Sequence, residues 1–182
     1  LISLVCKLLT HNSKIAQKQL TEQTVSILAT LKDDLFLWQT PDKMTKQVEQ
    51  VLLFLEKEGI AKHSKAEFWS LTGDTQQLSY IHHMAECIDE SLQRLAIITS
   101  LATRLAPLSR RDLEQKVVAI AKRLSVLNNI TAPEFIDKKA QATLINTMRE
   151  QGYIELNDDG LLITTDTMKQ LKTSVTNLVA IE

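Results

Sequence analysis

Two stretches of this sequence, about 90 residues apart, carry the same order of structural signals. The first is Glu56 to Thr75 (EKEGIAKHSKAEFWSLTGDT) and the second is Arg149 to Thr167 (REQGYIELNDDGLLITTDT). In each, a helix ends at a glycine, a strand follows, a polar turn intervenes, and a second strand leads to Thr and Asp. Asp159-Gly160 in the second turn is a strong hairpin signal. A chain that carries this unit twice is expected to contain two similar folding units.

The segments that precede the two hairpins also match. Leu20-Thr21 and Leu108-Ser109 are each typical of the capped start of a helix. Pro41-Asp42 and Pro133-Glu134 each favour the first turn of the helix that leads to the hairpin. The order of three helices and a β-hairpin is that of a winged-helix unit.

Glycine and proline are scarce, at four Gly and three Pro in 182 residues, and good helix formers are abundant. We therefore expect a mainly α fold with short β-hairpins, organised as two tandem winged-helix-like repeats at residues 1–89 and 90–182 and joined by a long helix. Apolar residues recur at helical spacing, and such stripes are expected to form cores rather than binding sites. These residues are Val48, Val51, Leu52 and Leu55, then Leu113, Val117, Ile120 and Leu124, and later Ile136, Ala140, Leu144 and Met148.

The joining stretch runs from about residue 75 to 106, and Pro107 is expected to end it. Its apolar residues follow a 3-4 spacing that is typical of a coiled-coil seam, which would also allow two copies to associate. The alternative is a break near Glu90, so that the halves serve separate cores, and the sequence favours neither arrangement. The seam residues are Leu78, Ile81, Ala85, Ile88, Leu92 and Leu95.

Helix and strand boundaries are especially dense from Arg123 to Glu155. Asn128-Asn129 is expected to end one helix, and Ala132-Pro133-Glu134 to begin another. Gly152 is expected to end that second helix, ahead of a short strand at 153–156.

This stretch resembles the C-terminal region of the bacterial membrane-bound glycerol-3-phosphate acyltransferases, and ATLKDDLFLW at 29–38 points the same way. The loose resemblance extends from Leu1 to about Asp158, and a start at Leu rather than Met agrees with a piece of a longer polypeptide. It implies a non-catalytic accessory region of an enzyme that transfers an acyl chain from acyl-CoA or acyl-carrier protein to sn-glycerol 3-phosphate, the first step of phospholipid synthesis. The implied partners are the catalytic N-terminal part of the same polypeptide and, through the full-length protein, the cytoplasmic face of the bacterial inner membrane. The fragment itself is expected to be soluble, and no cofactor is implied.

Members of that family carry a motif of His, four residues and Asp, in which His acts as the base toward the glycerol hydroxyl. No Asp completes the motif here. The histidines are His11, His63, His82 and His83, and the residues five positions further on are Ala16, Phe68, Cys87 and Ile88. The glycerol-phosphate motifs of the family, built around Arg and Gly, are also missing. We therefore expect no catalytic, cofactor-binding or metal-ligating residues in this chain.

One group of residues has a spacing that could in principle bind a metal ion. His83, Glu86 and Cys87 follow an i, i+3, i+4 pattern, but a core cysteine beside solvent-facing polar groups explains it better than a metal site. His82 and His83 point about 100° apart and cannot share one ion. Cys6 and Cys87 are expected to be reduced, buried thiols rather than a disulfide.

The distribution of charge along the sequence argues against binding of nucleic acid. The chain has a net charge of −1, and the two helices that lead to the hairpins, 41–58 and 133–150, carry net charges of −1 and zero. Only 108–127 is basic, which favours a solvated face or a contact with another domain. No run approaches the roughly 18 apolar residues that cross a bilayer, and we expect the apolar stretch 92–108 to be a core helix rather than an interfacial one. The alternative function is a stand-alone tandem winged-helix module that binds protein or DNA.

Overall fold

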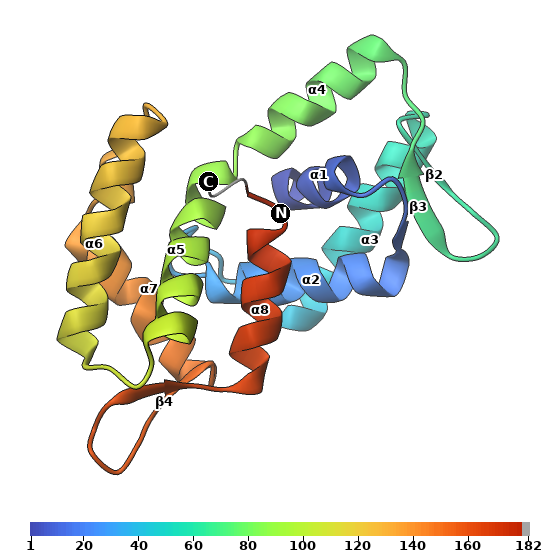
Figure 1. The fold of residues 1–182 in the computed structure, drawn as a ribbon. Coiled ribbons are helices and arrows are strands. Elements are labelled where there is room, and N and C mark those ends of the chain that lie inside the picture. The colour runs from blue at the N-terminus through green and yellow to red at the C-terminus, as the bar shows by residue number, and fades with distance from the viewer. Residues whose placement is uncertain (180–182) are drawn as a thin grey trace. The chain divides into compact units, whose positions relative to one another are not determined.

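The computed structural model describes residues 1–179, which divide into two compact units (Figure 1). The first unit contains Leu1–Ala29 and Trp38–Asp89, and the second contains Thr30–Leu37 and the chain from Glu90 onward. Both units consist mainly of helices with short antiparallel strands, so the predicted mainly α class with β-hairpins is confirmed. The last three residues of the second predicted repeat, 180–182, lie outside the described residues.

The first unit is a set of helices with one small sheet. Its elements are α1 (Ile2–His11), β1 (Ile15–Ala16), α2 (Gln17–Thr30), α3 (Pro41–Lys57), β2 (Ala61–His63), β3 (Phe68–Leu71) and α4 (Thr75–Glu86). β3 lies between the other two strands, so Trp69 has Ile15 as its partner on one side and His63 on the other. Helix α1 packs against α4 and contacts β3, and Trp69 on this central strand is only 2% exposed. The core of this unit therefore joins α1 and the sheet.

The second unit repeats much of this order. Its elements are α5 (Asp89–Leu105), α6 (Arg110–Leu127), the 3₁₀ turn η1 (Pro133–Phe135), α7 (Lys138–Glu150), β4 (Ile154–Leu156), β5 (Leu162–Thr164) and α8 (Asp166–Thr176). β4 and β5 form a hairpin, and Leu108 pairs with Leu162 through two backbone hydrogen bonds of 3.2 and 2.8 Å. Helices α6 and α7 lie side by side (Figure 1).

Several predicted boundaries are confirmed. Ser109 caps α6 by accepting a hydrogen bond from the N–H of Asp112 at 3.1 Å, and Asn128 is the residue at which α6 ends. Helix α7 ends just before Gly152, which has a φ of +73°. The N–H of Tyr153 bonds back to the carbonyl of Met148 at 2.9 Å, as expected after a left-handed glycine.

Two predicted helix starts were wrong. The helix expected from Pro133 to Glu150 is split, because Asp137 adopts an extended backbone and its carboxylate caps a new helix at the N–H of Ala140, 2.8 Å away. The helix expected to start at Leu20-Thr21 starts at Gln17, directly after strand β1, where the N–H of Gln17 bonds to the carbonyl of Glu67 at 3.0 Å.

The stretch 75–106 is two helices rather than one, which is the broken alternative. Helix α4 ends at Glu86, and the N–H of Ile88 bonds to the carbonyl of Ala85 instead of continuing the helical pattern. Ile88 is buried, and Asp89 pairs with Lys7 of α1 at 2.6 Å, so side-chain contacts hold this turn in place. Apart from half-buried Leu78, the residues of the predicted seam are buried within the chain.

Most of the apolar stripes form cores, as expected, and the long apolar stretch of α5 is buried rather than interfacial. The exception is Ile136, which is 38% exposed because it lies in the turn between η1 and α7. No helix within residues 1–179 is both long enough and apolar enough to cross a membrane.

Candidate functional site: a buried arginine and a basic groove

Arg94, on α5, is the one charged residue among those that the structure describes as buried, at 5% exposure. Its Nη2 pairs with the Oδ2 of Asp34, and its Nη1 donates to the backbone carbonyl of Glu134 at 3.4 Å. The hydroxyl of Ser91, one turn earlier on α5, donates to the same carboxylate at 3.3 Å. An unpaired buried cation costs several kcal/mol, so these acceptors are what make Arg94 tolerable on the buried face of α5.

Asp34 belongs to a short segment, Thr30–Leu37, that lies within the second unit although the first unit surrounds it in sequence. Its neighbour Asp33 accepts a hydrogen bond from the hydroxyl of Thr147 on α7 at 2.6 Å, and Thr147 is itself 1% exposed. Two weaker contacts extend the same junction. They are Lys32 with Glu150 at 3.9 Å and Thr30 with Gln151 at 3.2 Å.

Arg94 therefore links two segments that are about 100 residues apart in sequence, 30–37 and the chain around Glu134. The second of these is held in turn by α7, where the side-chain amide of Gln141 donates to the carbonyl of Phe135 at 2.8 Å. Phe135 is 1% exposed, which places the ring in the core. The side-chain donors of this cluster form hydrogen bonds with acceptors of the protein itself. The cluster therefore holds segments of the chain together.

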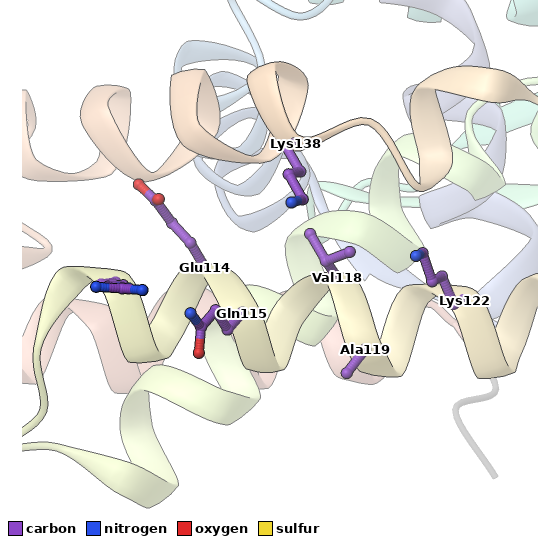
Figure 2. A pocket seen from close by; sticks show the side chains of 7 residues that line it. Glu114, Gln115, Val118, Ala119, Lys122 and Lys138 are labelled. Carbon is purple, nitrogen blue, oxygen red and sulfur yellow. The ribbon is translucent and has the colours of Figure 1, made fainter.

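A second feature is a groove of about 560 Å³ between α6 and α7 (Figure 2). Figure 2 shows Glu114, Val118 and Lys122 pointing from α6 toward α7, while Lys138 points from α7 toward α6. The remaining lining residues are Arg111, Gln115 and Ala119.

The groove carries an excess of positive charge. Glu114, its one carboxylate, is already paired with Arg110 at 2.7 Å. Among the described residues, Arg111, Lys122 and Lys138 form no ion pair. Three cations that form no ion pair therefore line the groove together with the apolar Val118 and Ala119, and this is a surface that suits an anion.

The histidines considered in the sequence lie on the surface. The ring of His63 stacks on Trp69, with ring centroids 4.9 Å apart and the ring planes 21° from parallel. His83 Nδ1 lies 3.3 Å from Glu86 Oε2, on the exposed side of α4, and His11 and His82 are also exposed.

The geometry at Cys87 differs from what was expected. Cys87 is exposed, and its thiol donates to the carbonyl of His83 at 3.3 Å, because the helix ends here and leaves that carbonyl free. Within residues 1–179, no group of three metal-ligating side chains gathers in one place. Cys6 is buried as predicted, and burial raises the pKa of its thiol to about 11. Both thiols are free.

The family described as "Glycerol-3-phosphate acyltransferase C-terminal region" matches residues 1–157. The chain belongs to this family.

Individual relatives of the chain have names that agree with this family. A glycerol-3-phosphate acyltransferase of Colwellia psychrerythraea (strain 34H) is 62% identical over 180 residues, which is 99% of this chain and 22% of that protein. Those of Shewanella baltica (strain OS155) and Aeromonas hydrophila are 34% and 31% identical and match 86% and 84% of this chain. The chain spans about a fifth of the length of these relatives. These matches give no support to the alternative of a stand-alone module.

The sequence pointed to the segment 29–38 but gave no contact for its two aspartates and no role for Arg94. A usable signal was present. An arginine in the apolar-rich stretch that was expected to be a core helix needs an anion, and the Asp33-Asp34 pair lies in a stretch that is otherwise mostly apolar.

Proposed function

We propose that this chain is the non-catalytic accessory region of an enzyme that transfers an acyl chain from acyl-CoA or acyl-carrier protein to sn-glycerol 3-phosphate, the first step of phospholipid synthesis. The name that the relatives share supports the reaction. The match to the C-terminal region of the family supports a location of the chemistry elsewhere in the polypeptide. By the same resemblance, the full-length enzyme acts at the cytoplasmic face of the bacterial inner membrane.

One observation carries the accessory role. The two segments on which the family resemblance rests, 29–38 and 123–155, use their side chains to hold each other in place. Asp33 bonds to Thr147 directly, and Arg94 holds both Asp34 and the backbone of Glu134. The segments that carry the resemblance to the family thus serve packing. This favours a region that supports the rest of the enzyme over a region that carries out the reaction.

We also propose that each unit is a winged-helix-like repeat, at about 1–89 and 90–182. The supporting features are the order of elements and the strand pairing. In the first unit β1 pairs with β3, and in the second unit the bridge from Leu108 to Leu162 occupies the corresponding place. The repeats then serve as paired packing modules for the catalytic part of the same polypeptide.

The test uses the full-length enzyme, a truncated enzyme that ends before Leu1, and the isolated 182-residue chain. Acylation of glycerol 3-phosphate by acyl-CoA is measured for each. We expect no turnover by the isolated chain and a large loss of activity in the truncated enzyme. In the full-length enzyme, Arg94→Ala should lower the thermal midpoint of inactivation, while Arg104→Ala, an exposed arginine on the same helix, should not.

Two results would contradict the proposal. Turnover by the isolated chain would place chemistry within it. Full activity and unchanged thermal stability of the truncated enzyme would show that the chain neither braces nor regulates the catalytic part.

A further inference from the structure

The outward face of α6 has an unusual composition. Its exposed residues occur at positions three and four apart, as expected for one side of a helix, and four of them are basic. The basic residues are Arg111, Lys116, Lys122 and Arg123. Only Asp112 opposes them on this face, and it accepts a hydrogen bond from Ser109 at 2.7 Å at the helix start. The remaining length of the face is therefore cationic.

The same face ends in two apolar side chains. Val126 and Leu127 form the last turn of α6 and are 82% and 76% exposed. Together with Lys122 and Arg123 they line a shallow depression of about 440 Å³. The outward face of a helix in water is ordinarily polar to its end, so this apolar turn beside two cations needs an explanation.

Negative charge is absent from the surrounding sequence. No Asp or Glu occurs from Gln115 to Pro133, although the chain has 22 acidic residues in all. The groove of Figure 2 adjoins this face through Lys122, which lines both the groove and the depression, and it contributes Arg111 and Lys138. The complement of such a surface is a broad array of anions with an apolar layer beneath it.

We propose that the outward face and C-terminal end of α6 dock on an anionic lipid bilayer. Lys122 and Arg123 then lie among the lipid phosphates, and Val126 and Leu127 insert below them. A single soluble phosphate would account for the cations of the groove but leaves the apolar turn unexplained. An acidic protein would likewise bind the cations, but it would not explain why the apolar side chains of Val126 and Leu127 are exposed. This inference stands whether or not the proposed acyltransferase role is correct, because it rests on the surface of α6 alone.

The first experiment places a probe at the apolar turn. In a Cys87→Ser background, Leu127→Cys is labelled with an environment-sensitive fluorophore, since Cys6 is buried and unreactive. Unilamellar vesicles of phosphatidylcholine with 30% phosphatidylglycerol should shift the emission to shorter wavelength, and brominated lipids should quench it. Vesicles of pure phosphatidylcholine should do neither. The matched control is Leu53→Cys on α3, another exposed leucine, which should show no shift.

The second experiment separates the sources of binding by co-sedimentation with the same anionic vesicles. We expect Lys122→Glu/Arg123→Glu to reduce the partition coefficient about tenfold or more, and Val126→Ser/Leu127→Ser to reduce it about tenfold. Lys43→Glu/Lys46→Glu and Leu53→Ser/Phe54→Ser, on the exposed face of α3, should leave it within twofold. High salt should weaken binding by the wild type. Circular dichroism confirms that each variant is folded.

Three outcomes would overturn the proposal. The first is recovery of the folded chain in the supernatant after co-sedimentation with anionic vesicles. Equally strong binding to soluble polyglutamate that survives Val126→Ser/Leu127→Ser would assign the face to an acidic polypeptide. A dimer in solution that this double variant dissociates would assign the apolar turn to a second copy of the chain.

Discussion

At the scale of single residues, Arg94 and Asp34 form the most demanding contact in the described chain, because both side chains are largely removed from water. Removing one partner leaves a buried charge without compensation. We expect Arg94→Ala and Asp34→Ala each to lower the free energy of unfolding by about 3–5 kcal/mol. Urea denaturation of the 182-residue chain, followed by circular dichroism, measures this, and Arg104→Ala should fall within about 0.5 kcal/mol of the wild type.

A double variant tests whether the loss comes from the orphaned charge. Arg94→Met/Asp34→Leu removes both charges and keeps most of the apolar volume. We expect it to lose less stability than the sum of the single Arg94→Met and Asp34→Leu variants. Strictly additive losses would mean that the two side chains are not coupled.

The two cysteines should differ sharply in reactivity. Burial raises the pKa of Cys6 to about 11, so at pH 8 this thiol is protonated as well as inaccessible. We expect a thiol-reactive dye to label one cysteine per native chain at pH 8 and two after unfolding. Cys87→Ser should abolish the native labelling, and fast native labelling of that variant would be inconsistent with a buried Cys6.

The same pKa shift gives a stability prediction. The folded chain retains the Cys6 proton at pH values where the unfolded chain, with an ordinary thiol pKa near 9, has lost it. The stabilisation is therefore fully present below pH 9 and is lost as the pH rises toward 11. Cys6→Ala should lack this particular decline in a pH series of urea midpoints, while Cys87→Ala should retain it.

At the scale of elements, the two glycines that end the helices before the hairpins can be compared directly. Gly59 and Gly152 have φ of +70° and +73°, and a Cβ at either position would meet nothing within 4 Å. Any loss of stability on substitution therefore comes from the positive φ of the backbone and not from a steric clash. We expect Gly59→Ala and Gly152→Ala each to cost about 1 kcal/mol of unfolding free energy, and the corresponding Asn variants to cost less. Equal losses for Ala and Asn would exclude backbone strain as the cause.

Helix and strand ends were predictable where their signals are local. Gly152, Ser109 and Asn128 act through bonds that span only a few residues, and the structure places them as expected. The break at Asp137 was missed because Pro133 gave an equally good helix start a few residues earlier. The start of α2 was missed because it depends on β1, whose partner strand lies more than 50 residues further on.

At the scale of the whole molecule, the chain enters the second unit twice, first at 30–37 and then from Glu90 onward. A fragment that begins at Glu90 therefore keeps Arg94 but lacks Asp34. We expect the sign of one substitution to reverse. Arg94→Met should destabilise the 182-residue chain by about 2–4 kcal/mol, yet stabilise the fragment 90–182, because there the cation has lost its counter-charge.

Thermal unfolding of four proteins tests this reversal. They are the complete chain and the fragment, each with Arg94 and with Met at position 94. Destabilisation of both by the same amount would show that Asp34 contributes nothing to the tolerance of the buried arginine. The sequence signals that a buried Arg94 needs an anion, but it does not identify Asp34 as that anion, since the pair spans 60 residues and no local pattern couples its members.

Because the second unit contains two separate stretches of the chain, its parts become available at different times during synthesis. A ribosome releases residues in order, at about 5–20 per second, and Arg94 follows Asp34 by 60 residues. For several seconds after Asp33 and Asp34 are synthesised, their partners on α5 and α7 have not yet been made. The remainder of the first unit, Trp38–Asp89, is synthesised in that interval, so the segment 30–37 must wait without its partners in the second unit until α5 and α7 have been made.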